Sequence, residues 1–225
     1  IKLDGNYPVG TNNVALGDTA LDSNVSGVNN TAVGSKALTA NTASDNTAVG
    51  YQAGDALTTG SYNNAFGHAS LSTATTGEQN AAFGRYSLNA NTSGSENTAV
   101  GNHALNSNTT ADNNTAVGYQ SLYANTSATG NTAVGFASGR TNTTGTDNVS
   151  LGYNAGYSNA SSSSNTSIGS HALYANTGAT NTALGTQALR FNSTGAGNTA
   201  VGYQAGFTNT TGTRLVAMGY TAALN

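Results

Sequence analysis

The chain contains no cysteine, no tryptophan and a single proline, Pro8, and only 7% of its 225 residues are charged. The absence of cysteine excludes a disulfide framework and a thiolate-bound zinc site. A formal net charge of −3, from six basic and nine acidic residues, argues against binding to nucleic acid or to an anionic membrane. No apolar run approaches the roughly 20 residues that a membrane-spanning helix needs, so we expect no membrane insertion. No charged segment followed by an apolar one opens the chain, so we expect no signal peptide.

Asparagine and threonine take the place of charge, with 32 Asn and 35 Thr in the chain. Much of this excess comes from one repeated motif, of which there are thirteen copies. Copies follow one another every 17 residues, except that the copies at 30–45 and 165–180 have 16. The string Asn-Thr-Ala-Val-Gly occurs unchanged at six places, which are 30–34, 46–50, 97–101, 114–118, 131–135 and 198–202. Related strings occupy the corresponding places in the other seven copies. We therefore predict a lead-in segment over 1–12 and one continuous repeat domain over 13–225.

Several repeat positions keep one kind of residue, when position 1 is the first residue of the five-residue string. Position 3 is always Ala or Ser, position 4 is always apolar, and position 5 is always Gly. Position 8 is always Ala or Ser, and position 9 is Leu in eight copies. Position 12 is Asn in ten of the twelve complete copies, and the remainder is a loop of Thr, Ser, Gly and Asn.

The length and composition of the repeat predict an all-β fold. A helical hairpin repeat needs at least about 33 residues, and Gly, Asn, Thr and Ser are poor helix formers. A short apolar stretch between Asn and Gly is typical of a strand ended by turns. One such unit cannot bury its apolar side chains alone, so the units must stack. The sequence therefore predicts a repetitive parallel β-solenoid of thirteen coils with about 17 residues each.

The alternation of side chains along a strand predicts which face is inside. Positions 2 and 4 face one way, and positions 1, 3 and 5 face the other. Because position 4 is apolar in every copy, we predict that it fills the interior of the coil. Positions 3 and 5 would then face outward, and their constant small size indicates that a neighbouring chain packs against them. The few apolar groups in each coil also favour association of several chains along their length.

The repeated asparagines have a structural interpretation and an alternative one. At positions 1 and 12, as in Asn114 and Asn125, an amide tolerates a left-handed backbone and forms ladders with copies above and below. The alternative is glycosylation, since Asn-X-Ser/Thr occurs often in the chain. Such matches are expected by chance in a sequence this rich in Asn and Thr, and they include Asn24, Asn91, Asn108, Asn125, Asn142 and Asn209.

The polar residues do not form an enzyme site, and we predict no catalytic residue, no cofactor and no resident metal. The three histidines are His68, His103 and His171, and no two of them share a site within one chain. Three copies of one histidine around a threefold axis could bind a metal or an anion, but an exposed surface role is more usual. Asp45, Glu96 and Asp147 are each three repeats apart, about 14 Å, which is too far for paired acid–base catalysis.

Aromatic residues form the candidate recognition site. Five tyrosines occupy position 6, directly after the constant glycine: Tyr51, Tyr119, Tyr153, Tyr203 and Tyr220. Position 10 carries four more aromatic residues, Tyr123, Tyr157, Tyr174 and Phe207. Exposed rows of tyrosine could bind glycans or proteins. The alternative is that these rings pack over adjacent loops and hold the coils together.

The repeat resembles two related groups of repeats, as shown by Asn-Thr-Ala-Val-Gly-Tyr-Gln at 114–120 and again at 198–204. One is the head repeat of trimeric autotransporter adhesins, and the other is the longer repeat in the shafts of phage tail fibres. The resemblance covers residues 13–222. It implies a left-handed parallel β-roll or β-helix in a parallel homotrimer. Adhesin heads commonly use shorter coils, so the seventeen-residue coil favours the tail-fibre type.

These observations predict a structural component of an extended trimeric fibre, located outside the cell, on a virion tail fibre or on a cell-surface appendage. The first alternative is an adhesin or receptor-binding head region on a bacterial surface, whose partner would be a host-surface glycan or protein. The remote alternative is an ice-binding solenoid with rows of threonine. Threonine recurs at position 2 in eight copies, but the predicted orientation places it on the interior face.

Overall fold

The computed structural model describes residues 10–224, so residues 1–9 of the predicted lead-in segment lie outside the described part. The chain divides into two compact units, residues 1–113 and 114–225, which we call the N-terminal and C-terminal units. Each is described by itself. Residues 10–224 contain no helix, and therefore none that could cross a membrane.

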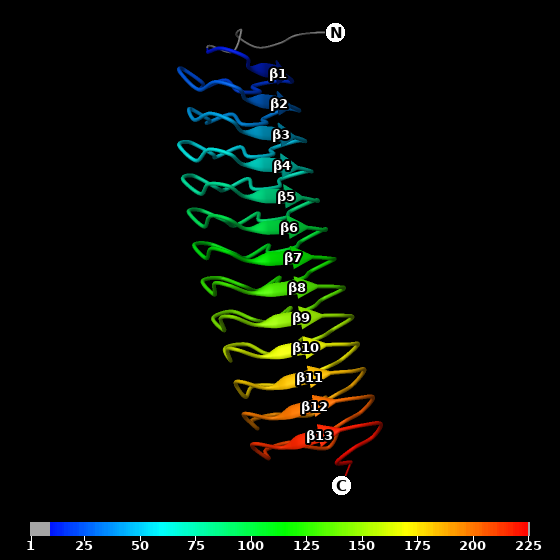
Figure 1. Cartoon of the computed structure of the whole chain (residues 1–225). Helices are drawn as coiled ribbons and strands as arrows, with labels where there is room; N and C mark the ends of the chain where they lie inside the picture. The colour runs from blue at the N-terminus through cyan, green and yellow to red at the C-terminus, as the bar shows by residue number, and fades with distance from the viewer. Residues whose placement is uncertain (1–9, 225) are drawn as a thin grey trace. The chain divides into compact units, whose positions relative to one another are not determined.

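Every repeat contributes one strand, formed by positions 2, 3 and 4. Figure 1 shows the strands of each unit lying one after another in chain order, with the rest of each repeat returning as a loop. The strands of the N-terminal unit are β1 (Val14–Leu16), β2 (Thr31–Val33), β3 (Thr47–Val49), β4 (Asn64–Phe66), β5 (Ala81–Phe83) and β6 (Thr98–Val100). Those of the C-terminal unit are β7 (Thr115–Val117), β8 (Thr132–Val134), β9 (Val149–Leu151), β10 (Thr166–Ile168), β11 (Thr182–Leu184), β12 (Thr199–Val201) and β13 (Val216–Met218).

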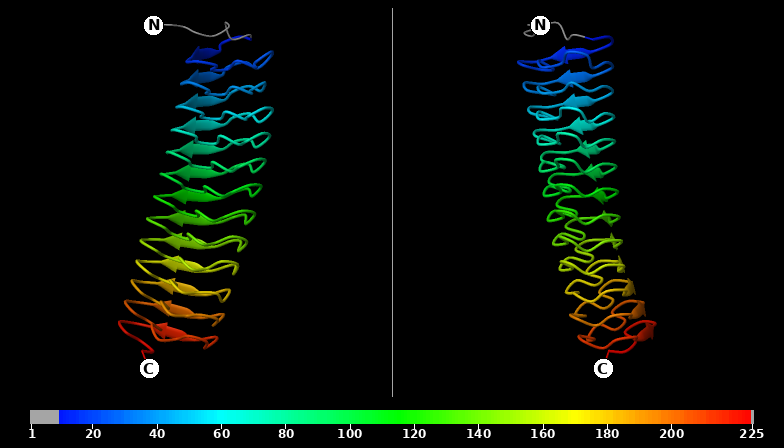
Figure 2. Two further views of the ribbon diagram at one scale, coloured as in Figure 1. Left: turned by 180° about the vertical axis from the view of Figure 1, so that it is seen from behind. Right: turned by 90° about the vertical axis from the view of Figure 1, so that its left-hand side faces the viewer.

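Strand pairing within each unit is parallel and in register, so that each repeat position lies beside the same position of the next coil. In β7 and β8, for example, Thr115 pairs with Thr132 and Val117 with Val134. The loops follow the same stacking in the two other views of Figure 2. The predicted all-β parallel solenoid, with one strand for each repeat, is confirmed.

Each strand is followed by the glycine at position 5, whose backbone conformation no other residue adopts without strain. Gly135 has a φ of +130°, and a Cβ atom built on it would lie 2.5 Å from the carbonyl oxygen of Gly152 in the next coil. Both the dihedral angle and the close approach of the two backbones require glycine here. The constant glycine therefore reflects contact between coils of the same chain.

The turn after the strand contains two left-handed residues in each coil, at positions 7 and 9. Gln120 and Leu122, for example, have φ values of +54° and +47°. A left-handed conformation costs about 1–2 kcal/mol for a residue other than glycine. Full burial of a leucine contributes about 1.5–3 kcal/mol, so the leucines at position 9 offset this strain by filling the core.

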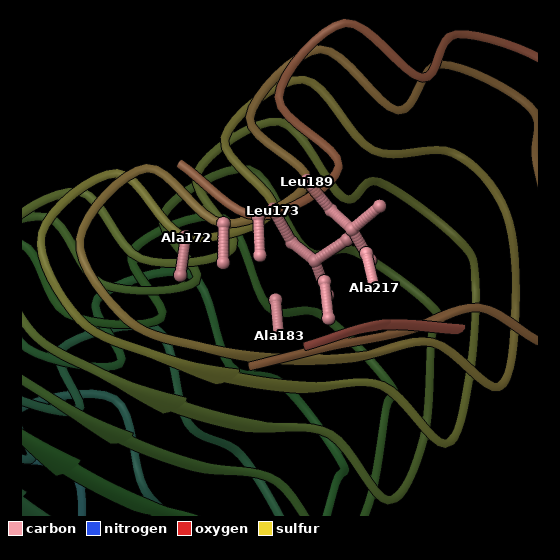
Figure 3. Close-up of a cluster of buried hydrophobic side chains, with 8 residues drawn as sticks. Ala172, Leu173, Ala183, Leu189 and Ala217 are labelled. Atoms are coloured by element: carbon pink, nitrogen blue, oxygen red, sulfur yellow. The ribbon is translucent and has the colours of Figure 1, made fainter. Parts of the chain in front are cut away.

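The predicted orientation of the strand is wrong, because position 3 faces the interior and positions 2 and 4 face outward. Ala116 and Ala133 are buried completely, whereas Val134 is 38% exposed and Leu184 is 45% exposed. The core consists of the alanine or serine at positions 3 and 8 of each coil and of the leucine at position 9 in the eight coils that have one. Figure 3 shows Leu173 and Leu189 of the C-terminal unit extending into the interior that Ala183 and Ala217 of the strands also line.

The narrow coil explains why the smaller side chain points inward. The leucine at position 9 already spans the interior, so the opposite strand has room only for a methyl or hydroxymethyl group. The same shortage of space explains three of the glycines at position 9. A Cβ atom on Gly54, Gly139 or Gly206 would lie about 3 Å from the leucine of the preceding coil, at 2.9, 3.0 and 2.9 Å respectively.

A ladder of buried asparagines at position 1 joins successive coils in each unit. The backbone N–H of Asn148 donates to Oδ1 of Asn131, 3.0 Å away, and the N–H of Asn165 donates in turn to Oδ1 of Asn148, also 3.0 Å away. The Nδ2 group of Asn148 donates to the carbonyl oxygen of Ser162 at the other side of the same coil. Each asparagine therefore closes its own coil and accepts a bond from the next.

The conformation at position 5 leads to a first prediction, for the Gly135→Ala variant. The substitution forces alanine into a φ near +130° and against the carbonyl oxygen of Gly152. We expect the free energy of unfolding to fall by at least about 3 kcal/mol. Guanidinium denaturation followed by far-ultraviolet circular dichroism measures this loss.

Gly197→Asn is the matched control for Gly135→Ala. Gly197 also has a positive φ, +68°, but a Cβ atom there would lie 3.9 Å from the nearest atom, and at its repeat position Asn29 and Asn113 adopt φ values of 59° and 60°. We expect the free energy of unfolding to change by no more than about 0.5 kcal/mol. Equal stability of the two variants would show that the coils do not approach each other at position 5 as described.

Candidate functional site

The first candidate surface is the outward face of the strands, formed by the side chains at positions 2 and 4 and called the strand face. Threonine is the commonest residue at position 2, and position 4 is always aliphatic or Phe, or Met in β13. In the N-terminal unit the rings of Phe66 and Phe83 stack along it, with centroids 4.8 Å apart and planes 7° from parallel. The strand face therefore exposes hydroxyl and apolar groups in rows along each unit.

No charged residue occurs on the strand face in any of the thirteen copies. The charged residues of the repeats lie in the turn after the strand, at positions 6, 7 and 10, or at the end of the loop. An exposed sheet surface usually carries lysine or glutamate, which keeps it soluble and prevents association. A half-exposed surface with apolar side chains and no charge is typical of a surface that binds a partner molecule.

The five tyrosines predicted at position 6 lie at the surface, with 42–77% of each side chain exposed. Tyr51 contacts His68 in the N-terminal unit, with ring centroids 5.3 Å apart and planes tilted by 32°. In the C-terminal unit, Tyr203 and Tyr220 form a stacked pair with centroids 5.2 Å apart. The rings thus use their faces to contact one another and expose mainly their edges and hydroxyl groups.

Tyr119 and Tyr153 belong to a longer run of aromatic rings in the C-terminal unit. Phe136 stacks between them, with centroids 5.3 Å from Tyr119 and 5.2 Å from Tyr153. The run continues from Tyr153 through His171 to Tyr174, at 5.3 and 5.4 Å. Tyr174 occupies position 10, so the structure brings the two predicted sets of aromatic residues into one network.

The sequence interpretation missed the arginines within this network. Arg140 and Arg190 occupy position 10 of their coils, in the same column as Tyr157 and Tyr174. The guanidinium carbon of Arg140 lies 5.7 Å from the ring centroid of Tyr157, and that of Arg190 lies 5.8 Å from the ring centroid of Tyr174. Alignment of position 10 across the thirteen copies would have revealed the arginines, whereas a search for motifs along the chain does not.

The histidines lie among aromatic rings at the surface. His103 stacks on Tyr86 with ring centroids 5.2 Å apart, and Arg85 lies over the same tyrosine, 4.4 Å from its centroid. Burial and the charge of Arg85 together lower the pKa of His103 below its ordinary value. Burial and the charge of Arg190 do the same for His171. Within residues 10–224, no group of three His, Cys, Asp or Glu side chains is placed to hold a metal ion.

The asparagines of the glycosylation motifs are structural. Asn91, Asn108 and Asn125 are completely buried, and Asn24 and Asn142 are almost so. Their side-chain nitrogens donate to the backbone carbonyl three residues later, as from Asn91 to Gly94 at 2.9 Å. The nitrogen that would carry a glycan is therefore enclosed within the coil. Asn209 makes the same bond, to Gly212 at 3.1 Å, from a more exposed position.

We predict that His103 titrates below 6.5, its ordinary pKa. Because its pKa is lower in the folded chain than in the unfolded one, the folded chain binds this proton more weakly. The contribution of His103 to stability is then complete above pH 6.5 and is lost as the pH falls through the lowered pKa. A proton NMR titration of the imidazole ring measures the midpoint.

The Arg85→Gln variant should raise that midpoint, because it removes the positive charge that repels the imidazolium. Arg85→Lys keeps the charge and is the control, with a midpoint close to that of the unaltered chain. A midpoint for His103 at or above 6.5, or one that does not respond to Arg85→Gln, would contradict the described packing of the two residues.

Comparison with protein-family models, with curated proteins and with solved structures finds no match to the chain. The resemblance to fibre-shaft and adhesin-head repeats therefore rests on the repeat motif itself.

Proposed function

We propose that the chain is a structural component of an extended fibre, in which three copies associate in parallel through their strand faces. The observation that carries the proposal is that every coil presents an uncharged strand face with a partly or largely exposed apolar side chain at position 4. Val134 and Leu184, for example, remain 38% and 45% exposed although they lie in the middle of the sheet. Association would remove these side chains from water, which contributes about 25 cal/mol for each Å² of apolar surface.

The regular spacing of the strand face favours a second copy of the same chain as its partner. Neighbouring parallel strands lie about 4.8 Å apart, so a partner that contacts every coil must repeat at the same interval. A parallel copy meets this condition because its own coils have the same spacing. It also places threonine beside threonine and aliphatic residues beside aliphatic residues, without bringing any like charges together.

The number three and the biological setting come from the resemblance to tail-fibre and adhesin repeats. We propose a location outside the cell, on a virion tail fibre or a cell-surface appendage. Each coil offers only a few apolar groups, whereas a stable protein interface buries about 800 Å² on each partner. Stable association therefore needs many coils in succession, which accounts for the uninterrupted repeat in a shaft.

One observation favours a second candidate function, ice binding. The threonines at position 2 face outward, as in Thr166, Thr182 and Thr199 of the C-terminal unit, rather than into the core. A flat row of hydroxyl and methyl groups at one regular spacing is suited to ordered water. Ice binding requires the strand face to be open, whereas the proposed fibre covers it.

Cysteine cross-linking tests the fibre, and the natural absence of cysteine makes the background clean. In a parallel, in-register trimer, Val134 of one copy lies near Val134 of the others. We expect the Val134→Cys variant to form a disulfide-linked dimer within the trimer upon mild oxidation, as seen by non-reducing electrophoresis. Thr144→Cys, which places the thiol on the exposed loop of the same coil, is the control and should remain unlinked.

A mixture of the Val134→Cys and Val100→Cys chains tests the direction of association. A parallel in-register assembly links each variant only to itself. In an antiparallel pairing over all thirteen strands, β8 of one copy lies beside β6 of the other, so the two variants link to each other. Light scattering on the unaltered chain gives the stoichiometry. A monomer at micromolar concentration would refute the proposed fibre.

An ice-recrystallisation assay separates the two candidate functions. If the strand face is buried between copies, we expect the purified assembly to leave the growth of ice crystals unchanged. Inhibition of recrystallisation by the unaltered chain, abolished by Thr182→Glu on the strand face, would instead favour the ice-binding solenoid. Thr194→Glu, on the loop side of the same repeat, is the matched control.

A further inference from the structure

A column of aromatic residues and arginines runs along position 10 of the C-terminal unit, and we call it the Tyr–Arg column. Six consecutive coils contribute to it: Tyr123, Arg140, Tyr157, Tyr174, Arg190 and Phe207. The same position in the N-terminal unit carries only small polar or acidic residues: Asp22, Thr39, Asp55, Ser72, Asn89 and Asn106. The repeat alone does not require the column, because six coils form without it.

Arg140 is held in place by its neighbours in adjacent coils. Its Nε donates to Oε1 of Gln120 and one terminal nitrogen donates to the hydroxyl of Tyr157, both at 3.0 Å. The guanidinium carbon lies 5.3 Å from the ring centroid of Tyr123 and 5.7 Å from that of Tyr157. A guanidinium has five N–H donors, so three of them are left for a ligand.

Arg190 packs in the same manner without any polar partner among the described residues. Its guanidinium carbon lies 5.2 Å from the ring centroid of Phe191 and 5.8 Å from that of Tyr174. Its Nε atom is buried and makes no hydrogen bond. The side chain is thus positioned by ring contacts alone, and its charge is not balanced by a carboxylate.

The charge of the C-terminal unit is also unbalanced. Residues 114–225 contain three arginines, Arg140, Arg190 and Arg214, and a single acidic residue, Asp147. Asp147 occupies the end of the loop rather than the turn that carries the column. The N-terminal residues 1–113 have the opposite balance, with three basic and eight acidic residues. The slight overall negative charge therefore conceals a positive surface along the column.

We propose that the Tyr–Arg column binds an acidic polysaccharide, with its carboxylates on Arg140 and Arg190. A guanidinium presents its donors in a planar fork that matches a carboxylate. The two arginines are three coils apart, about 14 Å, so the ligand must extend along the column and carry anionic groups at intervals. The half-buried tyrosines between them supply hydroxyl groups and ring edges for the sugar hydroxyls.

The stacking within the column favours a polysaccharide over a single-stranded nucleic acid. Proteins bind single strands by stacking bases on free aromatic faces. Here Tyr157 and Tyr174 stack on each other, with centroids 5.2 Å apart and planes 17° from parallel, and arginines lie over both rings. Hydroxyl groups and ring edges remain for a ligand. This site is distinct from the strand face, so it stands or falls independently of the proposed fibre.

The test uses the full chain and polygalacturonate as the probe, with calorimetric titration as the measurement. We expect polygalacturonate to bind and neutral dextran of similar length not to bind. Raising NaCl from about 50 mM to about 300 mM should weaken the binding, because salt screens charge pairs at the surface. The Arg140→Gln/Arg190→Gln double variant should bind at least about tenfold more weakly, since each carboxylate loses its charged partner.

The matched control is Arg85→Gln/Arg214→Gln, which removes two positive charges outside the column and should change the affinity less than about threefold. Circular dichroism shows whether each variant folds. If the Arg140→Gln/Arg190→Gln variant does not fold, the comparisons with dextran and with NaCl on the unaltered chain still test the proposal.

Three results would each overturn the proposal. The first is no binding of polygalacturonate by the unaltered chain, or equal binding of dextran. The second is an equal loss of affinity in the two double variants, which would show that overall charge alone attracts the polymer. The third is tighter binding of an oligothymidylate than of polygalacturonate, with the same dependence on Arg140 and Arg190, which would assign the column to nucleic acid.

Discussion

The rest of the structure depends on the hydrogen bonds between buried asparagines of successive coils. At position 1, the side-chain oxygen of one asparagine accepts the backbone N–H of the next, as between Asn148 and Asn165. Each bond contributes about 1 kcal/mol when made, and an unpaired buried donor would cost more. A coil can therefore add to the stack only if its backbone repeats that of the coil before. This requirement explains why the repeat length varies by no more than one residue.

The narrowness of the coil then determines the chemistry of the surface. A leucine from the turn fills the interior, as Leu122 does, so the strand contributes only small side chains to the core. The larger apolar residue of each strand is left outside, beside a threonine. An apolar outer face is thus a direct consequence of a thin core. The two candidate surfaces follow from different features, since the strand face arises from the repeat and the Tyr–Arg column from departures at position 10.

The sequence predicts the architecture well and the direction of the side chains poorly. The period, the strand, the parallel stacking and the asparagine ladder all follow from residues that recur at fixed spacing. The orientation does not, because it depends on Leu122 and its equivalents adopting a left-handed backbone and reaching across the coil. No local pattern signals that conformation. The five tyrosines at position 6 were found because they follow the constant glycine. Arg140 was missed because its partners are 17 or more residues away, and Arg190 because Tyr174 lies in the preceding coil.

Near-identity of the repeats also creates a problem of register during folding. If a segment docked one coil too far along, its asparagines would still find equivalent partners and its leucines would still meet alanines. The residues that differ between coils would detect such an error, because Arg140 would lose Tyr157 and the ring of Tyr157 would lose that of Tyr174. The two sixteen-residue copies would likewise meet loops of the wrong length. The contacts within the Tyr–Arg column thus differ from coil to coil, whereas the other contacts between coils are nearly the same in every repeat.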